Sequence, residues 1–320
     1  MPLSLRRGTV TSVIERHEEL IRLEVDGIPA IAYPRVTGPV EEGDDVLVNT
    51  QARDLGLGSG GFDVVYANLT RGLELPSEGT AHVMKLPYAP GQFASLHAEE
   101  SGETADALNG MPVVCCSLHS QIAPVCAGLG TGVRIAYLQL PGGALPVSLS
   151  DTIRALKERG LVETAVAVGA CFDGDVACVN VASALAWTAS ESYDAAVCAI
   201  GPGIVGTGSR LGHGGIAAAE VANAALALGG SPILCVRASS ADPRDRHRGV
   251  SHHTRAVLEL VLGEVTVAWP DQSDTDSWEE ACAGLPLSHM GRSPADDPAF
   301  FAAAFAAGRL ARDVVAPLSA

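Results

Sequence analysis

Apolar runs alternate with helical segments between residues 111 and 270, and this alternation limits the fold more than any other feature of the chain. The runs predicted to be strands are "PVVCCS", "RIAYLQL", "ETAVAVGACF", "YDAAVCAI", "SPILCVRAS" and "VTVAWP". Among the helical patterns between them, "SDTIRALKERG" has Ser150 or Asp151 as N-cap and Gly160 past its end. Six buried strands joined in this way favour right-handed crossovers. The pattern predicts an α/β fold, with a Rossmann-like, largely parallel, doubly wound sheet over residues 111–275.

Different patterns flank this domain. Residues 7–70 contain five short stretches of alternating apolar and polar residues, which is typical of a small N-terminal β-barrel and is assigned to residues 1–75. The segment "DLGLGSGGFD", from Asp54 to Asp63, is predicted to be a long hairpin loop. Residues 76–110 are predicted to be a linker, and residues 276–320 a C-terminal helical extension.

The helical extension carries an apolar stripe. Phe300, Phe301 and Phe305 fall on one helical face beside many alanines. Left uncovered, the stripe would be an exposed apolar patch, so we expect it to pack on the sheet domain or to join a homodimer.

Composition limits the partners. The formal net charge of −16 and a sequence pI near 4.9 argue against a nucleic-acid partner, because such proteins neutralise phosphates with a broad basic surface. No stretch of the chain is as long and apolar as a membrane span, and the start "MPLSLRRGTVTSVIE" has no apolar signal-peptide core after its two arginines, which predicts no membrane partner. The eight cysteines form no C-x-x-C pair, and most lie in apolar runs, which favours reduced thiols in a cytoplasmic protein.

Candidate site residues follow the predicted strands. In an open parallel sheet, ligands bind beyond the carboxyl ends of the strands. The segments at these positions hold His119, Asp175, Gly203, Arg237 and His252, so we expect these residues to surround one crevice.

The segment "GPGIVGTGSRLGHGG" is rich in glycine. It has a G-x-G-x-x-G spacing with one further candidate glycine: Gly201, Gly203, Gly206 and Gly208. A dinucleotide fingerprint needs a helix opening within the motif and an acidic residue ending the next strand. Here the helix begins only near Ile216 and the next strand ends in Arg237, so a nicotinamide cofactor is not expected. Two interpretations stay open: backbone N–H groups facing an anion, and a plain long loop.

The stretch "ADPRDRHRGVSHHTR" (residues 241–255) gathers four arginines and three histidines in an acidic chain. The residues predicted to bind an anion are Arg237, at the end of the strand before this stretch, and Arg244, Arg246 and Arg248 within it. At least one of them is expected to reach the glycine-rich segment. Candidate catalytic residues are His252, His253 and Asp242. On an extended segment the two adjacent histidines point opposite ways, so at most one is expected to act on a ligand. The alternative is a solvated basic loop that pairs with the acidic remainder of the protein.

A metal site is a further alternative, built from His252 or His253 with Asp242, His213 or Asp175. No H-x-x-x-H or H-E-x-x-H spacing supports it. The sequence therefore identifies no metal and no cofactor.

The runs "GPGIVGTGSRLG" and "ADPRDRHRGVSHHT", together with "HVMKLPYAPGQ" and "SLHSQIAPV", carry a resemblance that covers nearly the whole chain. The chain resembles an uncharacterised bacterial family, domain-of-unknown-function family 3866. The resemblance implies no activity and no ligand. The family pattern places an aspartate after the second strand of the sheet domain, where this chain has "LPGGALP", so a role for that aspartate does not transfer.

These features predict an enzyme that acts on a small anionic metabolite, including phosphorylated metabolites and nucleotides, at the carboxyl edge of the sheet. The glycines supply backbone contacts, the arginines supply charge, and His252 or His253 transfers a proton or binds a metal. The competing hypothesis is a non-catalytic sensor of a small ligand, or an oligomeric assembly module. Sequence does not separate these hypotheses, because a binding pocket and an active site differ in the placement of a few atoms.

Overall fold

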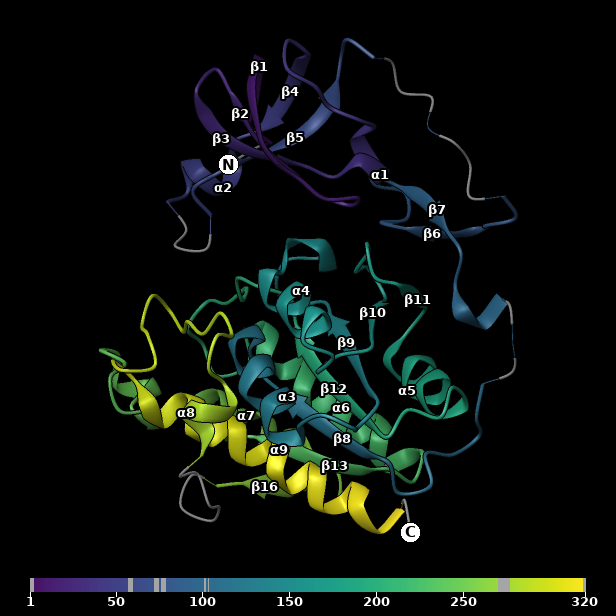
Figure 1. Cartoon of the computed structure of the whole chain (residues 1–320), viewed down its shortest axis with the longest axis vertical. Helices are drawn as coiled ribbons and strands as arrows, with labels where there is room; N and C mark the ends of the chain where they lie inside the picture. The colour runs from purple at the N-terminus through teal and green to yellow at the C-terminus, as the bar shows by residue number, and fades with distance from the viewer. Residues whose placement is uncertain are drawn as a thin grey trace. The chain divides into compact units, whose positions relative to one another are not determined.

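The computed structural model describes residues 3–56, 60–71, 75, 79–100, 102, 104–269 and 277–318, with side chains up to residue 315. The chain forms two compact units, Met1–Ser95 and Leu96–Ala320 (Figure 1). The segment predicted to be a linker contains an antiparallel pair of strands, β6 (Val83–Lys85) and β7 (Phe93–Ser95).

The N-terminal unit contains the predicted β-barrel. Its strands close in the order β1-β2-β3-β5-β4. Their bounds are β1 Leu5–Arg16, β2 Ile21–Val25, β3 Ile28–Ala32, β4 Asp45–Asn49 and β5 Asp63–Asn68, and the short helices are α1 Pro34–Thr37 and α2 Gln51–Asp54. Successive side chains of a strand point to opposite faces, so the apolar alternation fills the barrel, with Val10, Leu23 and Val46 in its core. Residues 57–59 of the predicted hairpin loop lie outside the described residues.

The C-terminal unit is built on one parallel sheet of seven strands in the order β11-β10-β9-β12-β8-β13-β16. The bounds are β8 Pro112–Cys116, β9 Ile135–Leu140, β10 Thr164–Val168, β11 Val176–Cys178, β12 Ala195–Ile200, β13 Ser231–Cys235 and β16 Thr266–Ala268. The fold class is therefore confirmed, with one strand more than the six predicted. The additional strand is β11, which has three residues and follows β10 without a helix, so neither length nor periodicity signals it.

Helices cover both faces of the sheet, as a doubly wound fold requires. One face packs against α3 (Ile122–Leu129), α4 (Asp151–Glu158), α8 (Trp278–Ala281) and α9 (Pro298–Leu318). The other packs against α5 (Val181–Ser190), α6 (Ala217–Ala227) and α7 (His252–Leu260). Local sequence determines where these helices begin: Ser150, one of the two predicted N-caps of α4, accepts a hydrogen bond from the Ile153 N–H at 3.0 Å.

The aromatic stripe of α9 is buried against the sheet of its own unit. Phe300, Phe301 and Phe305 belong to the core between α3, α9 and the sheet, and the Phe301 ring stacks on Trp278 at 6.0 Å. Helix α9, yellow in Figure 1, contacts β8, β13 and β16 and lies against α3. Of the two expected surfaces, the sheet domain is the one that covers the stripe. The stripe thus supplies no reason to expect a homodimer.

The crossing of α3 and α9 depends on two glycines. A Cβ atom on Gly308 would lie 2.0 Å from the Val125 carbonyl oxygen, and one on Gly128 would lie 2.4 Å from that of Phe305. Replacing a mid-helix glycine with alanine ordinarily stabilises a helix by about 0.5–1 kcal/mol. We expect Gly308→Ala to lower the free energy of unfolding instead, by about 1–3 kcal/mol, because the two backbones must separate. Urea denaturation, with the exposed Arg309→Ala as control, measures this; a Gly308→Ala protein as stable as wild type would contradict the packing.

All eight cysteines are free and buried, as predicted. Burial raises the pKa of the Cys282 thiol to about 12 and holds that of Cys198 well above its ordinary value, so these thiols are protonated at neutral pH. Within the described ranges, no helix is both long and apolar enough to cross a membrane.

Candidate functional site

Three adjacent strands, β12, β8 and β13, end beside one another in the sheet. The segments that follow them are residues 201–216, 117–121 and 236–255. The chain leaves β8 toward the face of α3, but leaves β12 and β13 toward the face of α6 and α7. Such reversals are where open α/β sheets bind their ligands. These three segments, which hold most of the candidate residues, therefore converge at one edge, and a Cβ atom on Gly215 would lie 3.0 Å from the Ser117 carbonyl oxygen.

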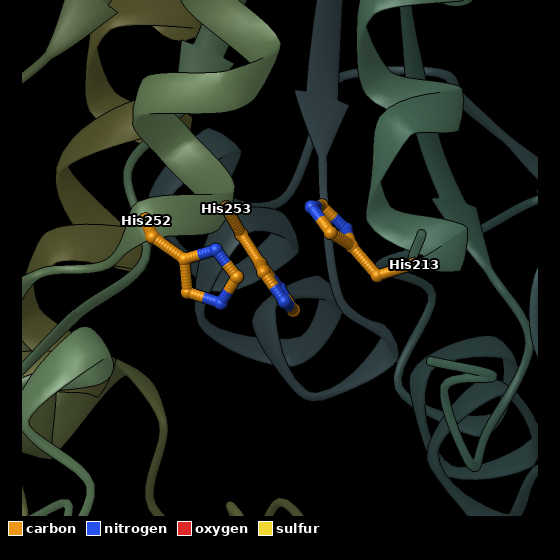
Figure 2. Close-up of side chains that lie close together, drawn as sticks. All are labelled: His213, His252 and His253. Atoms are coloured by element: carbon orange, nitrogen blue, oxygen red, sulfur yellow. The ribbon is translucent and has the colours of Figure 1, made fainter. Parts of the chain in front are cut away.

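Four histidines, which we call the histidine cluster, gather at this edge: His213 after β12, and His247, His252 and His253 after β13. The rings of His213 and His253 are stacked, with centroids 3.6 Å apart and planes 13° apart (Figure 2). The His252 centroid lies 4.5 Å from that of His253, and the His247 centroid lies 4.9 Å from both. Segments from two sides of the sheet edge thus meet through imidazole rings.

The sequence analysis assumed that His252 and His253 lie on an extended segment, but the structure places them in a helix. They are the first two residues of α7, whose N-cap Ser251 accepts a hydrogen bond from the His253 N–H at 3.2 Å. Successive side chains of a helix differ in direction by about 100° rather than 180°. Both rings therefore lie in the cluster (Figure 2). The prediction that the two side chains point opposite ways was wrong, because the backbone here is helical rather than extended.

Hydrogen bonds determine the proton positions on two of these rings. The His213 Nε2 lies 3.1 Å from the Arg210 carbonyl oxygen, which only accepts, so Nε2 carries the proton and Nδ1 is a bare acceptor. The His253 Nδ1 lies 3.0 Å from Arg237 Nη1, which only donates, so Nδ1 is the acceptor there. Both contacts fit a neutral ring that carries its proton on Nε2.

Burial and nearby guanidinium groups keep the cluster uncharged. Burial, followed by Arg237, lowers the pKa of His253 to about 2 and that of His247 to about 3. Burial, followed by Arg246, also lowers the pKa of His252. These histidines are neutral at physiological pH, so the positive charge at this edge of the sheet comes from arginine.

A buried carboxylate, Asp242, positions three of the arginines. Arg244 donates to it through Nε at 2.9 Å and Nη2 at 2.8 Å. Arg292 Nη2 lies 3.3 Å and Arg237 Nη2 3.5 Å from its Oδ2. Burial alone would raise the pKa of Asp242, but the hydrogen bonds from Arg244 hold it well below its usual value. Asp242 is thus a permanent anion with occupied oxygens, which suits positioning better than proton transfer.

Arg237 presents a free edge of its guanidinium group. The residue is 0 % exposed, and its Nη1 donates to His253. Its Nε and Nη2 have no hydrogen-bond partner among the described residues, the contact of Nη2 with Asp242 being an ion pair without a hydrogen bond. Arg244 uses the same pair of nitrogens to hold both oxygens of Asp242. Buried donors without acceptors cost free energy, so this edge favours an oxyanion beside it.

The sequence analysis missed His289, which lies ahead of α9. Its ring stacks on Phe300 with centroids 3.7 Å apart, and its Nδ1 lies 3.1 Å from Ser120 Oγ. Burial, followed by Arg237, lowers the pKa of His289 to about 3. Its Nε2, like the His213 Nδ1 and the His252 Nε2, is buried without a hydrogen-bond partner among the described residues. Unpartnered buried nitrogens therefore gather around Arg237.

Arg292 was also absent from the residues predicted to form the site. It connects Asp242 to Asp297, whose Oδ2 lies 3.2 Å from Arg292 Nε. Asp297 in turn accepts a hydrogen bond from the Ser240 N–H at 3.0 Å, just after β13. The polar run "SHMGRSPADDP" was the available signal in the sequence. Its position at the strand ends follows from the docking of α9, which sequence alone does not show.

Several glycines of the segment after β12 serve contacts between loops. A Cβ atom on Gly201 would lie 2.0 Å from the Ala144 carbonyl oxygen, and one on Gly214 would lie 2.0 Å from that of Gly142. The loops after β12 and β9 therefore touch through their backbones. This contact explains these glycines, and the run "LPGGALP", without a ligand.

Other glycines shape the turn that presents His213. Gly206 pairs with His213 in an isolated antiparallel bridge. Gly203 and Gly208 have φ angles of 69° and 81°, which favour glycine. Gly208 also faces the basic stretch, since a Cβ atom there would lie 3.5 Å from Arg246 Nη2.

Two exposed arginines of the basic stretch point in different directions. Arg246 lies against Gly208, and its charge helps to lower the pKa of His252 after burial. The Arg248 side chain is 60 % exposed, and its Nη1 lies 3.7 Å from Asp245, which is itself 97 % exposed. The structure thus brings one arginine of the stretch to the glycine-rich segment and leaves the other facing solvent.

Two further candidates have other surroundings. The His119 Nε2 lies 2.7 Å from Ser150 Oγ, at the start of α4, and burial lowers the pKa of His119 to about 4. Asp175 lies at the opposite edge of the sheet, where its Oδ2 accepts from the Ala165 N–H at 2.7 Å and its Oδ1 from Lys157 Nζ at 2.6 Å. The expectation that Asp175 joins the crevice was wrong. The chain runs back along β10 before β11 begins, because the two strands are parallel.

The profile of the family described as "Protein of unknown function (DUF3866)" matches residues 29–283. The chain belongs to the DUF3866 family. No curated protein matches it. The matched residues of this DUF3866 protein include the histidine cluster and Asp242, but they end before His289, Arg292 and Asp297.

In this DUF3866 protein, His213, His252 and His253 also meet the first requirement of a metal site, since one nitrogen of each lies within 4.8 Å of the others (Figure 2). Three observations oppose a cation. The rings of His213 and His253 lie in nearly parallel planes with centroids 3.6 Å apart, so the in-plane lone pairs of one ring do not lie in the plane of the other. The His253 Nδ1 already accepts from Arg237. Finally, the charges of Arg237 and Arg246 would repel a divalent cation. The residues present do not fit a metal ion.

A cavity of this DUF3866 protein, of about 270 Å³, lies at the opposite, amino edge of the sheet. Its lining includes Leu108, Met111, Tyr193 and Asp194, and contains no arginine or histidine. The hollow and the concentrated polar groups thus fall in different places. We base the candidate site on the polar groups, because buried donors without partners cost free energy that a bound acceptor would recover.

Proposed function

We propose that the protein binds a small metabolite through an oxyanion, a phosphate or a carboxylate, at the carboxyl edge of its parallel sheet. The observation that carries this proposal is the Nε and Nη2 edge of Arg237, which is buried, charged and without hydrogen-bond partners among the described residues. An oxyanion that accepts two parallel hydrogen bonds from this edge would supply the acceptors that the Arg237 donors lack. Arg246, beside Gly208, would contact the same ligand from the exposed side.

The neutral histidines support an enzyme as the first form of this function. The Nε2 atoms of His252 and His289 are buried without partners, which is costly unless a ligand uses them. We assign proton transfer with the ligand to His252, whose neutral ring is able to accept a proton. His253 is held by Arg237, and Asp242 by three arginines, so in this proposal both position the site.

One observation favours the second form, a non-catalytic sensor of the same ligand. A general base works best with a pKa near the operating pH, whereas burial, followed by Arg246, lowers the pKa of His252, and the neighbouring His247 and His253 have pKa values of about 3 and about 2. A sensor needs hydrogen bonds from these rings and no proton transfer. Incubating a ligand that binds with the purified protein, and following product by mass spectrometry, separates the two: product identifies an enzyme, and unchanged ligand a sensor.

Arg246 and Arg248 provide a matched test of the binding site. Each lies in the basic stretch and changes the net charge equally when replaced by alanine, but Arg246 alone faces Gly208. We expect Arg246→Ala to weaken binding of phosphate, nucleotides or carboxylate metabolites about 10- to 100-fold, the value of a charge-assisted hydrogen bond. Arg248→Ala should change it by less than about fivefold. Thermal-shift titrations measure both. Equal effects, or no stabilisation of the wild-type protein by any of these anions, would reject the site.

We also propose a cytoplasmic location, supported by the eight free, buried thiols, which are typical of proteins in a reducing compartment. A homodimer keeps no support from α9, whose aromatic stripe is buried in its own unit.

A further inference from the structure

We infer that the oxyanion site selects a dianionic group, of the kind that a phosphate monoester carries, over a monoanion such as a carboxylate or sulfonate. The inference rests on the proposed function and specifies the charge of its ligand. It is carried by the balance of fixed charges around Arg237 and by the position of the charges left unbalanced.

The fixed charges at the site do not cancel. Ion pairs around the free edge join Arg237, Arg244, Arg292, Asp242 and Asp297, and Arg246 is close enough to lower the pKa of Arg237. Four guanidinium groups against two carboxylates leave two positive charges. The histidine cluster adds none, because its rings are neutral. The exposed pair of Arg248 and Asp245 cancels itself outside the site.

We assign the two unbalanced charges to Arg246 and to Arg237, whose ion pair with Asp242, at 3.5 Å, is longer than those of Arg244 and Arg292. Arg244 donates to Asp242 through both Nε and Nη2. Arg292 donates to both Asp242 and Asp297. The charges of Arg244 and Arg292 are therefore paired with carboxylates. Arg237 keeps its Nε and Nη2 edge free, and no carboxylate within the described residues pairs with Arg246. Burial, then Arg244, lowers the pKa of Arg237 to about 10 against the opposing effect of Asp242, with smaller contributions from Arg292 and Arg246, so the neighbouring cations add to the cost of burying this charge.

A dianion would neutralise this repulsion, whereas a monoanion would leave one charge uncompensated in a largely buried place. The three oxygens of a phosphoryl group also offer more acceptors than a carboxylate does. Arg237 would take two of these bonds through its free edge. The Nε2 atoms of His252 and His289 are able to contribute hydrogen bonds without adding charge. Number of donors and net charge therefore point to the same class of ligand.

The first experiment compares two ligands that differ in charge and little in shape. Phenyl phosphate is a dianion at pH 7.5, and benzenesulfonate is a monoanion with the same ring and three terminal oxygens. Isothermal titration calorimetry of the full chain with each should give at least about tenfold tighter binding of phenyl phosphate. Inorganic phosphate is titrated in parallel, and tighter binding of phenyl phosphate than of inorganic phosphate shows that the ligand is an ester rather than the free ion.

A second arm uses the ionisation of the ligand itself. Phosphate monoesters lose their second proton near pH 6, so the affinity for phenyl phosphate should rise about tenfold from pH 5 to 7.5. Sulfate is a dianion throughout this range, so its binding reports any titration of the protein and should not rise. Arg246→Gln should reduce the preference for phenyl phosphate over benzenesulfonate, and Arg248→Gln should leave it unchanged.

Each outcome has one meaning. Equal affinity of the wild-type protein for phenyl phosphate and benzenesulfonate would overturn the charge selectivity and leave the oxyanion site intact. Parallel increases with pH for phenyl phosphate and sulfate would also overturn it. No binding of phenyl phosphate, benzenesulfonate, inorganic phosphate or sulfate would reject the proposed function together with this inference.

Discussion

Replacing Arg237 with lysine is expected to weaken binding of phosphate at least about hundredfold while the protein stays folded. Lysine keeps the positive charge but loses the Nε and Nη2 edge, which is the feature on which the site depends. Two charge-assisted hydrogen bonds are worth about 3 kcal/mol or more together. The fold should tolerate the change because Asp242 retains Arg244 and Arg292 as partners. Calorimetric titration with phosphate gives the affinity, and circular dichroism the folded state.

Arg134→Lys is the matched control for this substitution. Arg134 binds Glu163 with two prongs, at 3.0 and 2.7 Å, near the amino edge of the sheet. Its replacement also loses a two-pronged contact, so any general effect of the change appears there, while phosphate affinity should not move. If the Arg237→Lys protein binds phosphate as tightly as the Arg134→Lys protein does, Arg237 is not part of the phosphate site.

Asp242→Asn is expected to lower the free energy of unfolding by about 3–5 kcal/mol, the usual cost of removing one partner from a buried ion pair. The carboxylate is 0 % exposed and is the shared anion of Arg237, Arg244 and Arg292. Asparagine preserves the shape but leaves Arg237 and Arg244 without their countercharge, while Arg292 keeps Asp297. Urea denaturation followed by far-UV circular dichroism measures the loss. Asp245→Asn, at a position 97 % exposed, is the control and should change stability by less than about 0.5 kcal/mol.

The stability difference between wild type and Asp242→Asn should also depend on pH. The folded-state pKa of Asp242 lies below the ordinary value near ~4 that the unfolded chain has. Its ionisation therefore contributes its full stability above about pH 4 and loses it as pH falls through the folded-state pKa. The gap should shrink on acidification below about pH 4. The depressed histidine pKa values destabilise both proteins alike down to about pH 3, the folded-state pKa of His247 and His289, on which Asp242 also acts. A gap that is constant from pH 7 to pH 3 would contradict the assignment of Asp242 as the buried anion.

Periodicity was enough to predict the two folds, because each depends on the burial of local apolar patterns. Alternation with period two fills a barrel with Val10, Leu23 and Val46, and six apolar runs separated by helices become strands of one parallel sheet. The exception is β11, whose three residues are too few to show a period. Asp175 was predicted at the carboxyl edge but lies at the amino edge, because the chain returns along β10 before β11 begins. This return contains no helix or strand that the sequence pattern would reveal.

The candidate site was accessible from the sequence where it follows a strand directly. Arg237, Asp242 and the pair His252 and His253 lie after β13, and the carboxyl ends of parallel strands share an edge whatever the detailed packing. The prediction placed His252 and His253 on an extended segment, although Ser251, a residue type preferred at N-caps, precedes them and caps α7 in the structure. That one boundary decides whether both rings lie in the cluster.

The sequence by itself thus determined the layers, the strand ends and the arginines that lie there, since these follow from local burial and from the handedness of the chain. Tertiary structure alone decided which arginines are held by carboxylates and which are free. Asp242 joins Arg292, fifty residues later in the chain, because α9 docks beside α3 and carries the segment before it to the strand ends. A hydrogen bond needs its atoms within about 3 Å. Contacts at that range between distant segments depend on the packing of the whole unit, and the free edge of Arg237 is a product of that packing.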